Sequence, residues 1–311
     1  MADYPTHIQI EPHIHMIRGA NDARFPEANT LLIDDEILTL VDAGSHPDQV
    51  FSTLRDLGHQ PEDLERIILT HYHADHKGYA AYLRSISECE VLCHPLAKEG
   101  VESFQAMMKF IGINNLETKE HWLNLLQARL PHVQEDYIVD STFLDDKPID
   151  CGEIQLIPLH SPGHTHDHTC FGINGLEKVL LVDIDLTEFG PWYGNTVSDI
   201  MDFKKSIEYI IDLQPKMGIS SHLLDPVTEN LAEKLKWYLE FFQKRDEEIL
   251  HYITAGINTI SKLAQIPIIY PRIPHPAYFI FEELMLEKHL ELLSKNDLVI
   301  LHDGQFQVLR A

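Results

Sequence analysis

The chain has 311 residues, of which 44% are hydrophobic, enough for one large globular domain with a smaller appendage. Its 24 basic and 49 acidic residues give a formal net charge of −25, which argues against nucleic acid or an anionic membrane as a partner of the whole molecule. No basic leader precedes an apolar stretch, and no apolar run approaches the roughly eighteen residues of a membrane span. We therefore expect a cytoplasmic protein, with its four scattered cysteines as reduced thiols packed in or near strands.

The N-terminal part shows the pattern of short antiparallel strands. Residues 8–41 alternate apolar and polar side chains and are punctuated by glycine, asparagine and proline. Asp42 follows directly, and its carboxylate is in position to cap a helix expected at residues 47–57.

A dense group of metal-ligand side chains comes directly after the apolar run 67–69. The candidate ligands within this stretch are His71, His73, Asp75 and His76. Imidazole and carboxylate without cysteine suit zinc, manganese or iron. A strand at 66–69 and a helix at 77–85 would hold these ligands at a compact corner. A histidine-rich polar turn is the alternative, since the chain has 20 histidines, but the alternating spacing is that of a motif.

An insertion follows at about residues 95–131. Residues 97–111 and 116–130 both carry apolar side chains at helical spacing, and residues 112–115 join them, so we predict a helical hairpin. The hairpin could form a lid or one wall of a substrate pocket, because its methionine-rich surface adapts to acyl or aromatic groups. Packing on the core, or a contact between two copies in a homodimer, is the alternative.

Three later segments carry further side chains of the ligand type. His164 lies in the segment Ser-Pro-Gly-His-Thr, and His222 follows Ile-Ser-Ser. The apolar run 179–182 predicts a strand that ends at Asp183, and this strand-end position favours Asp183 over Asp185 as a ligand.

Beyond residue 225 the pattern becomes helical and charged. Helices are predicted at residues 230–254, 257–265 and 277–293, with a proline-rich link before the third and a β-hairpin at 298–309 after it. This is the element order of a winged helix, so we expect domains at 1–224 and 225–311. The third helix is acidic, through Glu282, Glu283, Glu287 and Glu291, which opposes contact with phosphates and favours a structural or dimerising role.

The spacing of His71, His73, Asp75 and His76 resembles the H-x-H-x-D-H signature of the metallo-β-lactamase superfamily, and nearly the whole chain fits its glyoxalase II-like or β-lactamase-like subgroup. The resemblance implies an α/β fold (α+β), an αββα sandwich of two mixed sheets with the metal site at one edge. The helical insertion and a small C-terminal winged-helix-like domain would extend it. Val182, where a small residue usually precedes the bridging Asp, and Tyr79, where a second glycine is usual, depart from the family pattern.

The resemblance also implies a cofactor and a ligand set. Two divalent metal ions are expected, zinc first, with manganese or iron as alternatives. The ligands would be His71, His73 and His164 for one ion, Asp75, His76 and His222 for the other, and Asp183 as the bridge. Asp42 would accept a hydrogen bond from a ligand histidine, its helix cap being the alternative, and His168 would support the ligands from outside.

Two loops would border the metal site in such a fold. Within residues 189–194, Trp192 or Tyr193 is expected to line the pocket, and Tyr193 is a candidate catalytic donor to an oxyanion. Within residues 19–27, Phe25 would touch substrate or fill a gap. Aromatic residues between glycines often only anchor a loop, which is the plainer interpretation of residues 189–194.

Together these features predict a binuclear metal-dependent hydrolase. A hydroxide bridging the two ions would attack an ester, thioester or lactone carbonyl of a small-molecule substrate, while catalytic Asp75 orients the nucleophile or carries its proton. A phosphodiesterase or ribonuclease would use the same ions, but the net negative charge argues against a polyanionic substrate. A sulfur dioxygenase with a single iron is the other alternative, and the identity of the metal would separate it.

Overall fold

The computed structural model describes residues 4–113, 116–273 and 275–309, and its centre is a pair of mixed β-sheets. The strands of the first sheet, in spatial order, are β1 (His7–Glu11), β2 (Ile14–Ile17), β3 (Thr30–Ile33), β4 (Thr39–Val41), β5 (Arg66–Leu69), β6 (Glu90–Cys93) and β7 (Ser141–Thr142). Those of the second are β12 (Met217–Ser220), β11 (Lys178–Val182), β10 (Thr169–Ile173), β9 (Gln155–His160) and β8 (Ile149–Asp150). Strands β4 to β7 are parallel, as are β11 and β12, and the other pairs are antiparallel.

The alternation of side chains along each strand builds the layers. In β5, Ile68 packs between the two sheets, whereas Ile67 and Leu69 belong to the core on the helix side. In β11, Val182 likewise packs between the sheets and Leu181 on the helix side. Both faces of these strands are therefore buried, which explains why they appear in the sequence as continuous apolar runs.

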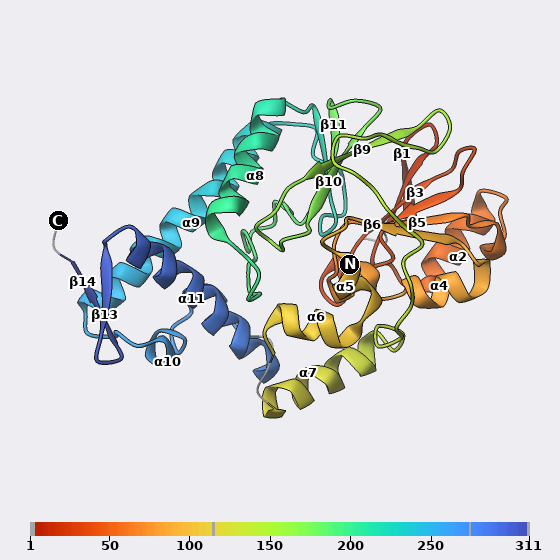
Figure 1. Cartoon of the computed structure of the whole chain (residues 1–311). Coiled ribbons are helices and arrows are strands. Elements are labelled where there is room, and N and C mark those ends of the chain that lie inside the picture. Colours follow the sequence, from red (N-terminus) through yellow and green to blue (C-terminus); the bar gives the residue numbers. More distant parts are fainter. Residues whose placement is uncertain (1–3, 114–115, 274, 310–311) are drawn as a thin grey trace.

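Helices cover the outer faces of both sheets, which confirms the predicted αββα sandwich (Figure 1). The first sheet carries α2 (Pro47–Asp56) and α4 (Ala80–Ser87), and the second carries α8 (Ile200–Leu213). Short turns of helix complete this part of the chain: α1 (Ala20–Ala23), η1 (Pro61–Asp63) and α3 (Ala74–Lys77). All four cysteines lie in the described part, and each is a buried free thiol in or next to a strand, as predicted.

The insertion between β6 and β7 is helical but is divided differently from the prediction. It consists of α5 (Lys98–Glu102), α6 (Phe104–Ile111) and α7 (Leu116–Arg129). The expected helix 97–111 is broken at Ser103, whose extended backbone and side-chain oxygen, which accepts from the Ala106 amide, start a new helix. Asn114 and Asn115, in the predicted link, lie outside the described residues.

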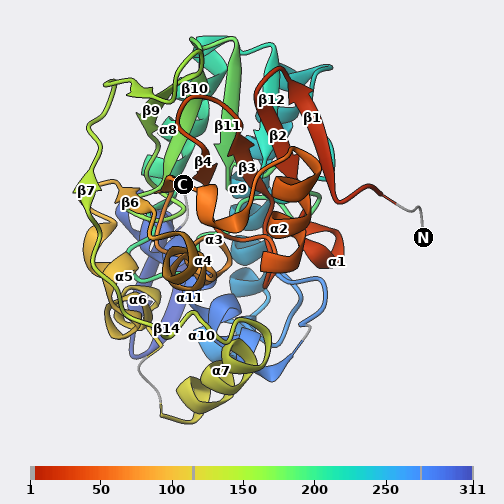
Figure 2. The ribbon, with the colours of Figure 1, turned by 90° about the vertical axis from the view of Figure 1, so that its right-hand side faces the viewer.

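The C-terminal part follows the predicted element order. It contains α9 (Leu231–Thr254), α10 (Ile260–Leu263), η2 (Pro276–Tyr278), α11 (Phe279–Lys295), β13 (Val299–His302) and β14 (Gln305–Val308). Figure 1 shows the start of α11 close to α7 of the insertion, and in Figure 2 the insertion and the C-terminal helices lie together below the two sheets. One expectation is corrected: Glu282 is buried, and its carboxylate accepts from the amides of Ile269 and Tyr270, so it does not add to an acidic surface.

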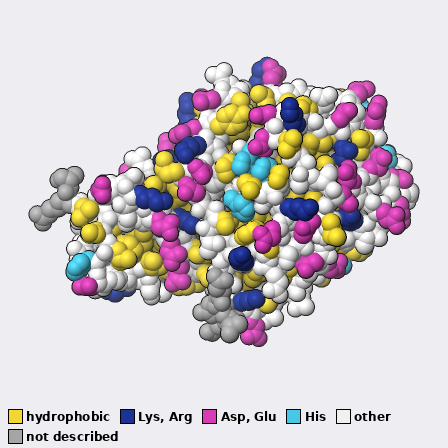
Figure 3. All heavy atoms as spheres, viewed as in Figure 1, with side chains coloured by type: hydrophobic (Ala, Val, Ile, Leu, Met, Phe, Trp, Pro, Cys, Tyr) yellow, Lys and Arg dark blue, Asp and Glu magenta, His cyan; other side chains and the backbone are white. Residues whose placement is uncertain are grey.

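The surface carries the charge imbalance of the sequence without a continuous basic stripe on the face shown in Figure 3. Within the described ranges, no helix is both long and apolar enough to cross a bilayer.

Candidate metal centre

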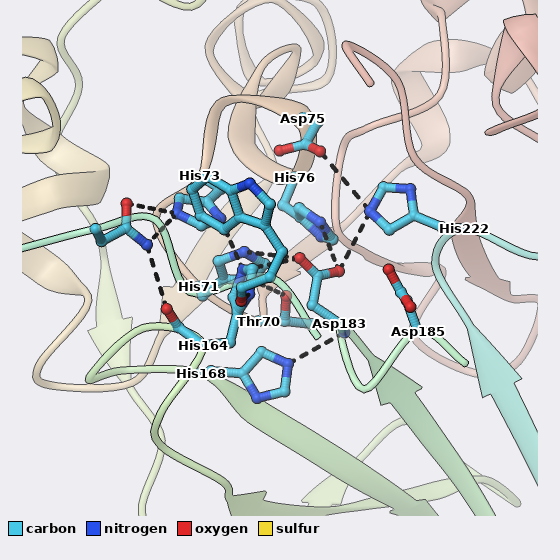
Figure 4. A network of polar contacts seen from close by, with 12 residues as sticks. Thr70, His71, His73, Asp75, His76, His164, His168, Asp183, Asp185 and His222 are labelled. Carbon is cyan, nitrogen blue, oxygen red and sulfur yellow. Dashed lines mark hydrogen bonds and ion pairs between the residues drawn. The ribbon is translucent and has the colours of Figure 1, made fainter. Parts of the chain in front are cut away.

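The candidate ligands meet at one edge of the sandwich, where four strands end (Figure 4). His71 and His73 follow β5, and Asp75 and His76 lie in α3 directly after them. The remaining three each follow a strand of the second sheet: His164 after β9, Asp183 after β11 and His222 after β12. Since β11 and β12 run parallel, their carboxyl ends meet at the same edge.

Two groups of side chains there are arranged closely enough to hold a metal ion each. The ligand atoms of the first group lie within 4.8 Å of one another and come from His71, His73, His164 and Asp183. The second group, with the same spacing, consists of Asp75, His76 and His222. All seven residues that the motif and the resemblance selected are therefore brought together.

Asp183 lies between the two groups. Its Oδ2 atom is 2.9 Å from His164 Nε2 and 3.6 Å from His71 Nε2. Its Oδ1 atom is 3.2 Å from His76 Nε2 and 3.3 Å from His222 Nε2. Each carboxylate oxygen thus faces one group, the arrangement that a shared ligand requires. Asp185 is placed otherwise, because its Oδ1 accepts from the Tyr238 hydroxyl.

The hydrogen bonds around the histidines leave lone pairs directed into the site. The nitrogen that points outward is bonded in each case: His71 Nδ1 to Thr70 Oγ1, His73 Nε2 to Asn195, His76 Nδ1 to Asp42, His164 Nδ1 to the Trp192 carbonyl, and His222 Nδ1 to the Ala23 carbonyl. The inner nitrogens of His71, His76, His164 and His222 then carry no proton when the rings are neutral, which is the form that binds metal. His73 Nε2 lies 3.2 Å from Oδ1 and 3.0 Å from Nδ2 of Asn195.

The donor set fits divalent cations. The inner nitrogens His73 Nδ1 and His164 Nε2 are only 2.9 Å apart. Within the described residues, the buried atoms His71 Nε2, His76 Nε2 and Asp183 Oδ1 have no hydrogen-bond partner. Cations held in the two groups would satisfy these atoms, and a nitrogen and oxygen set suits zinc, manganese or iron.

The electrostatics of the cluster follow from burial and mutual contact. Burial, helped by neighbouring imidazoles, holds the pKa values of His71 and His73 well below their usual range. Burial opposes ionisation of Asp183, but the imidazoles of His76, His164 and His222 hold its pKa well below the ordinary value. Burial likewise disfavours protonated His222, but the Asp183 carboxylate raises the His222 pKa to about 9.

Asp42 supports the second group. Its Oδ2 accepts from His76 Nδ1 at 2.7 Å, and the Thr70 amide and hydroxyl each donate to one of its oxygens at 2.9 Å. The cap of α2 is instead supplied by His46, whose Nδ1 accepts from the Asp48 amide. Of the two roles weighed for Asp42, the geometry favours ligand orientation.

His168 supports Asp183 in the same way. Its Nδ1 donates to the Ser161 carbonyl at 2.9 Å, and its Nε2 accepts from the Asp183 amide at 3.2 Å. Burial lowers the His168 pKa to about 3, so the ring is neutral and able to accept this bond.

Tyr193 requires a correction. Its ring is fully buried and outside the pocket, and its hydroxyl is shared between His289 Nε2 at 2.5 Å and Arg245 Nη1 at 2.9 Å. A hydroxyl held in this way does not reach a substrate, so Tyr193 anchors its loop. Trp192 and Phe189 are the members of the loop that line the pocket, and Phe25 from residues 19–27 lines it too.

A cavity of about 950 Å³ opens onto the site. Its walls come from parts of the chain that are distant in sequence. They include Phe25 of the N-terminal loop and Trp192 of the loop after β11, together with Ile111 and Trp122 of the insertion and Tyr270, Tyr278 and Phe281 of the C-terminal part. The insertion therefore supplies part of the pocket wall, while most of its apolar side chains, Met107 and Met108 among them, pack in the core as the alternative expected. Asn195 and the C-terminal aromatic residues were missed in the sequence, because only the tertiary structure brings them to the site.

The fold and the site define the class of metallo-β-lactamase-fold hydrolases. A model of the metallo-beta-lactamase superfamily matches residues 24–222, and the chain belongs to this superfamily.

The comparisons also return individual proteins to which the chain is similar. It is 23% identical over 280 residues to an atrochrysone carboxyl ACP thioesterase of Passalora fulva, covering 87% of this chain and 72% of that protein. It is 25% identical over 220 residues to a beta-lactamase-like protein 2 homolog of Caenorhabditis elegans, covering 68% of this chain and 60% of that protein.

Solved structures share the fold over almost the whole chain. A metallo-beta-lactamase family protein of Thermus thermophilus has a TM-score of 0.72 at 20% identity and covers 97% of this chain and 100% of that one. A beta-lactamase domain protein of Burkholderia ambifaria has a TM-score of 0.69 at 16% identity, with coverage of 100% and 96%.

Proposed function

We propose that the protein is a two-metal hydrolase that cleaves a thioester or ester bond of a small molecule. The observation that carries the proposal is the position of Asp183, with one carboxylate oxygen facing each group of candidate ligands. Two divalent ions, when bound, lower the pKa of water toward neutrality and stabilise negative charge on a carbonyl oxygen.

The residues of this chain would divide the work. His71, His73 and His164 would hold one ion, His76 and His222 with Asp75 the other, and Asp183 both. Asp75 also lines the cavity, with an oxygen 3.8 Å from His222 Nε2, and so would orient the attacking water and accept its proton.

The thioester is favoured among the carbonyl substrates by the relatives. Three of the curated proteins similar to this chain are named atrochrysone carboxyl ACP thioesterases, from Passalora fulva, Pseudocercospora fijiensis and Aspergillus fumigatus. The wall of the cavity is also rich in apolar side chains, which suits an acyl group and not a polyanion.

Residues 225–311, as a winged-helix-like domain, would complete this cavity. Tyr270, Tyr278 and Phe281 from this part line it beside Trp122 of the insertion. Their position supports a role in substrate recognition, and the net charge of −25 disfavours nucleic acid as the partner.

The metal content of the purified protein and its activity on a panel of thioesters, lactones and phosphodiesters test the proposal. We expect about two zinc or manganese ions per chain, and thioester hydrolysis that a chelator abolishes and added metal restores. Asp183→Asn should lower the metal content and reduce kcat by at least about a hundredfold. The matched control is Asp150→Asn, which changes an exposed carboxylate of β8.

Other outcomes would overturn the proposal. One iron per chain with oxidation of a sulfur substrate would indicate a dioxygenase. Cleavage of phosphodiesters without thioester hydrolysis would indicate a nuclease or phosphodiesterase. Unchanged metal content in Asp183→Asn would show that Asp183 is not a ligand shared by two ions, which is the arrangement on which the proposal rests.

A further inference from the structure

A continuous row of aromatic side chains forms one wall of the cavity. We name this row the aromatic belt; its members, all of which line the cavity, are Phe25, Trp122, Tyr278, Phe281, Trp192 and Tyr270. They come from the N-terminal loop, the insertion, the loop after β11 and the C-terminal part.

The rings of the belt contact one another in sequence. Phe25 and Trp122 are stacked, with centroids 5.5 Å apart and an angle of 18° between the planes. Trp122 meets Tyr278 edge to face at 5.6 Å and Phe281 at 5.1 Å. Phe281 in turn lies 5.4 Å from Trp192, which completes the row.

One end of the belt reaches the candidate metal centre. The Trp192 ring lies 5.4 Å from the His73 ring and 5.6 Å from that of His164. A group held along the belt would therefore have its reacting end beside Asp183 and its body among the aromatic rings.

Hydrogen bonds hold two members of the belt, Trp192 and Tyr270, in place. Trp192 Nε1 donates to the Tyr270 hydroxyl at 2.7 Å, and the Tyr270 amide donates to the buried Glu282 carboxylate at 2.8 Å. Because these rings are already fixed, a ligand that stacks on them loses its own freedom but little of theirs.

From the contacts between the rings and the position of Trp192 beside the candidate metal centre, we propose that the belt binds the acyl part of the substrate and that this acyl part is a planar aromatic group. Ring-on-ring contacts add about 0.5–1.5 kcal/mol to the burial of apolar area, an advantage that a straight alkyl chain of equal carbon number does not receive. The cavity, at about 950 Å³, has room for more than one fused ring. The reaction rests on the proposed function, whereas the binding preference does not.

The test measures binding of two uncharged probes to the full-length protein by calorimetry: 2-naphthamide and undecanamide, which have the same number of carbon atoms. We expect 2-naphthamide to bind about tenfold more tightly. Trp122→Leu should weaken 2-naphthamide about tenfold and change undecanamide by less than about threefold, while Trp122→Phe should retain most of the stacking. The control Trp237→Leu, on α9 outside the cavity, should leave both affinities unchanged.

Phe25→Leu removes the other ring of the stacked pair and gives a second, independent variant. Equal or tighter binding of undecanamide, or equal losses for both probes in Trp122→Leu and Phe25→Leu, would overturn the proposal. Thermal unfolding of each variant shows whether a loss of binding affinity comes from misfolding. If the leucine variants are misfolded, the affinities of Trp122→Phe for the two probes decide the outcome.

The proposed function can fail separately. Selective binding of 2-naphthamide that depends on Trp122, without hydrolysis of any ester or thioester, would keep the belt and reject the reaction. Hydrolysis of thioesters with kcat/KM values equal for naphthoyl and undecanoyl groups would keep the reaction and reject the belt.

Discussion

His164 Nδ1 donates to the backbone carbonyl oxygen of Trp192 at 2.8 Å, so a candidate metal ligand takes its orientation from the loop that carries the aromatic belt. That loop is itself fixed by Arg245 of α9. The buried guanidinium donates to the carbonyls of Phe189 and Pro191 and to the Tyr193 hydroxyl. The C-terminal part therefore positions the metal centre as well as the pocket wall.

Replacement of Arg245 should reach the metal centre through this loop. Arg245→Met leaves two buried carbonyls without donors, so we expect a loss of about 2–4 kcal/mol in unfolding free energy. We also expect metal affinity, measured by competition with a chelator, to fall about tenfold as His164 loses its fixed orientation.

The neighbouring Lys244→Met is the matched control, because Lys244 is exposed on the same helix. Arg245→Lys retains the charge but not the planar fork, and it should recover only part of the loss. If folded Arg245→Met kept full metal affinity, the loop that Arg245 holds would not be needed to orient His164.

Asp42→Asn should weaken metal binding without removing any candidate ligand. The amide no longer accepts strongly from His76 Nδ1, so the orientation and basicity of that ring are lost. We expect a decrease of about 10–100-fold in metal affinity or in kcat. Asp34→Asn is the control, since Asp34 accepts from His59 Nε2 at the same 2.7 Å, away from the site. Equal effects of the two substitutions would refute the orienting role.

Because of Lys77, the unfolding free energy of the protein should increase as the pH rises into the alkaline range. Its buried ammonium donates to the carbonyls of Gly100 and Val101, and burial lowers its pKa to about 8. In the unfolded chain the lysine pKa returns to its ordinary value of 10.5, so that chain binds more protons between these two values. Unfolding free energy therefore increases with pH over this window.

Comparison with Lys77→Met isolates this contribution from other titrating groups. The unfolding free energy of the wild type minus that of the variant should rise by about 2 kcal/mol from pH 7 to pH 10, as measured by urea denaturation. A difference that is flat or falling over this range would show that Lys77 titrates normally.

Val182 should respond unusually to glycine. Its backbone has φ of 55°, in the left-handed region, where a residue with a side chain costs about 1–2 kcal/mol more than glycine. Val179 lies in the same strand, is equally buried and has no positive φ. At each position, the Gly variant is compared with the Ala variant by their unfolding free energies. The amount by which Gly is less stable than Ala should be about 1–2 kcal/mol smaller at Val182 than at Val179. Equal penalties at the two positions would exclude backbone strain before Asp183.

Local patterns in the sequence predicted strands such as β5 and the candidate ligands at residues 71–76, whereas His164 and His222 were selected through the family resemblance. The run 66–69 forms β5 as predicted, and the spacing of residues 71–76 is compact enough to specify neighbouring ligands. Asp183 could be preferred over Asp185 because it directly follows the apolar run of its strand. The αββα sandwich itself came from the family resemblance, which the match to the superfamily supports.

Side-chain direction and long-range assembly could not be predicted in this way. Tyr193 and Trp192 are adjacent in the sequence, but only Trp192 faces the cavity, because the Tyr193 hydroxyl finds partners on α9 and α11. Glu282 belongs to an acidic stretch, yet backbone amides of the proline-rich link hold it inside. No periodicity relates Phe25, Trp122 and Phe281, so the belt exists only in the folded molecule.

The aromatic belt joins residues from both ends of the chain, whereas every candidate metal ligand lies between residues 71 and 222. All candidate ligands are therefore synthesised before Tyr270, Tyr278 and Phe281. A chain that stopped after His222 would contain every candidate ligand but would lack both Arg245 and half of the belt, so neither the centre nor the pocket wall would be complete.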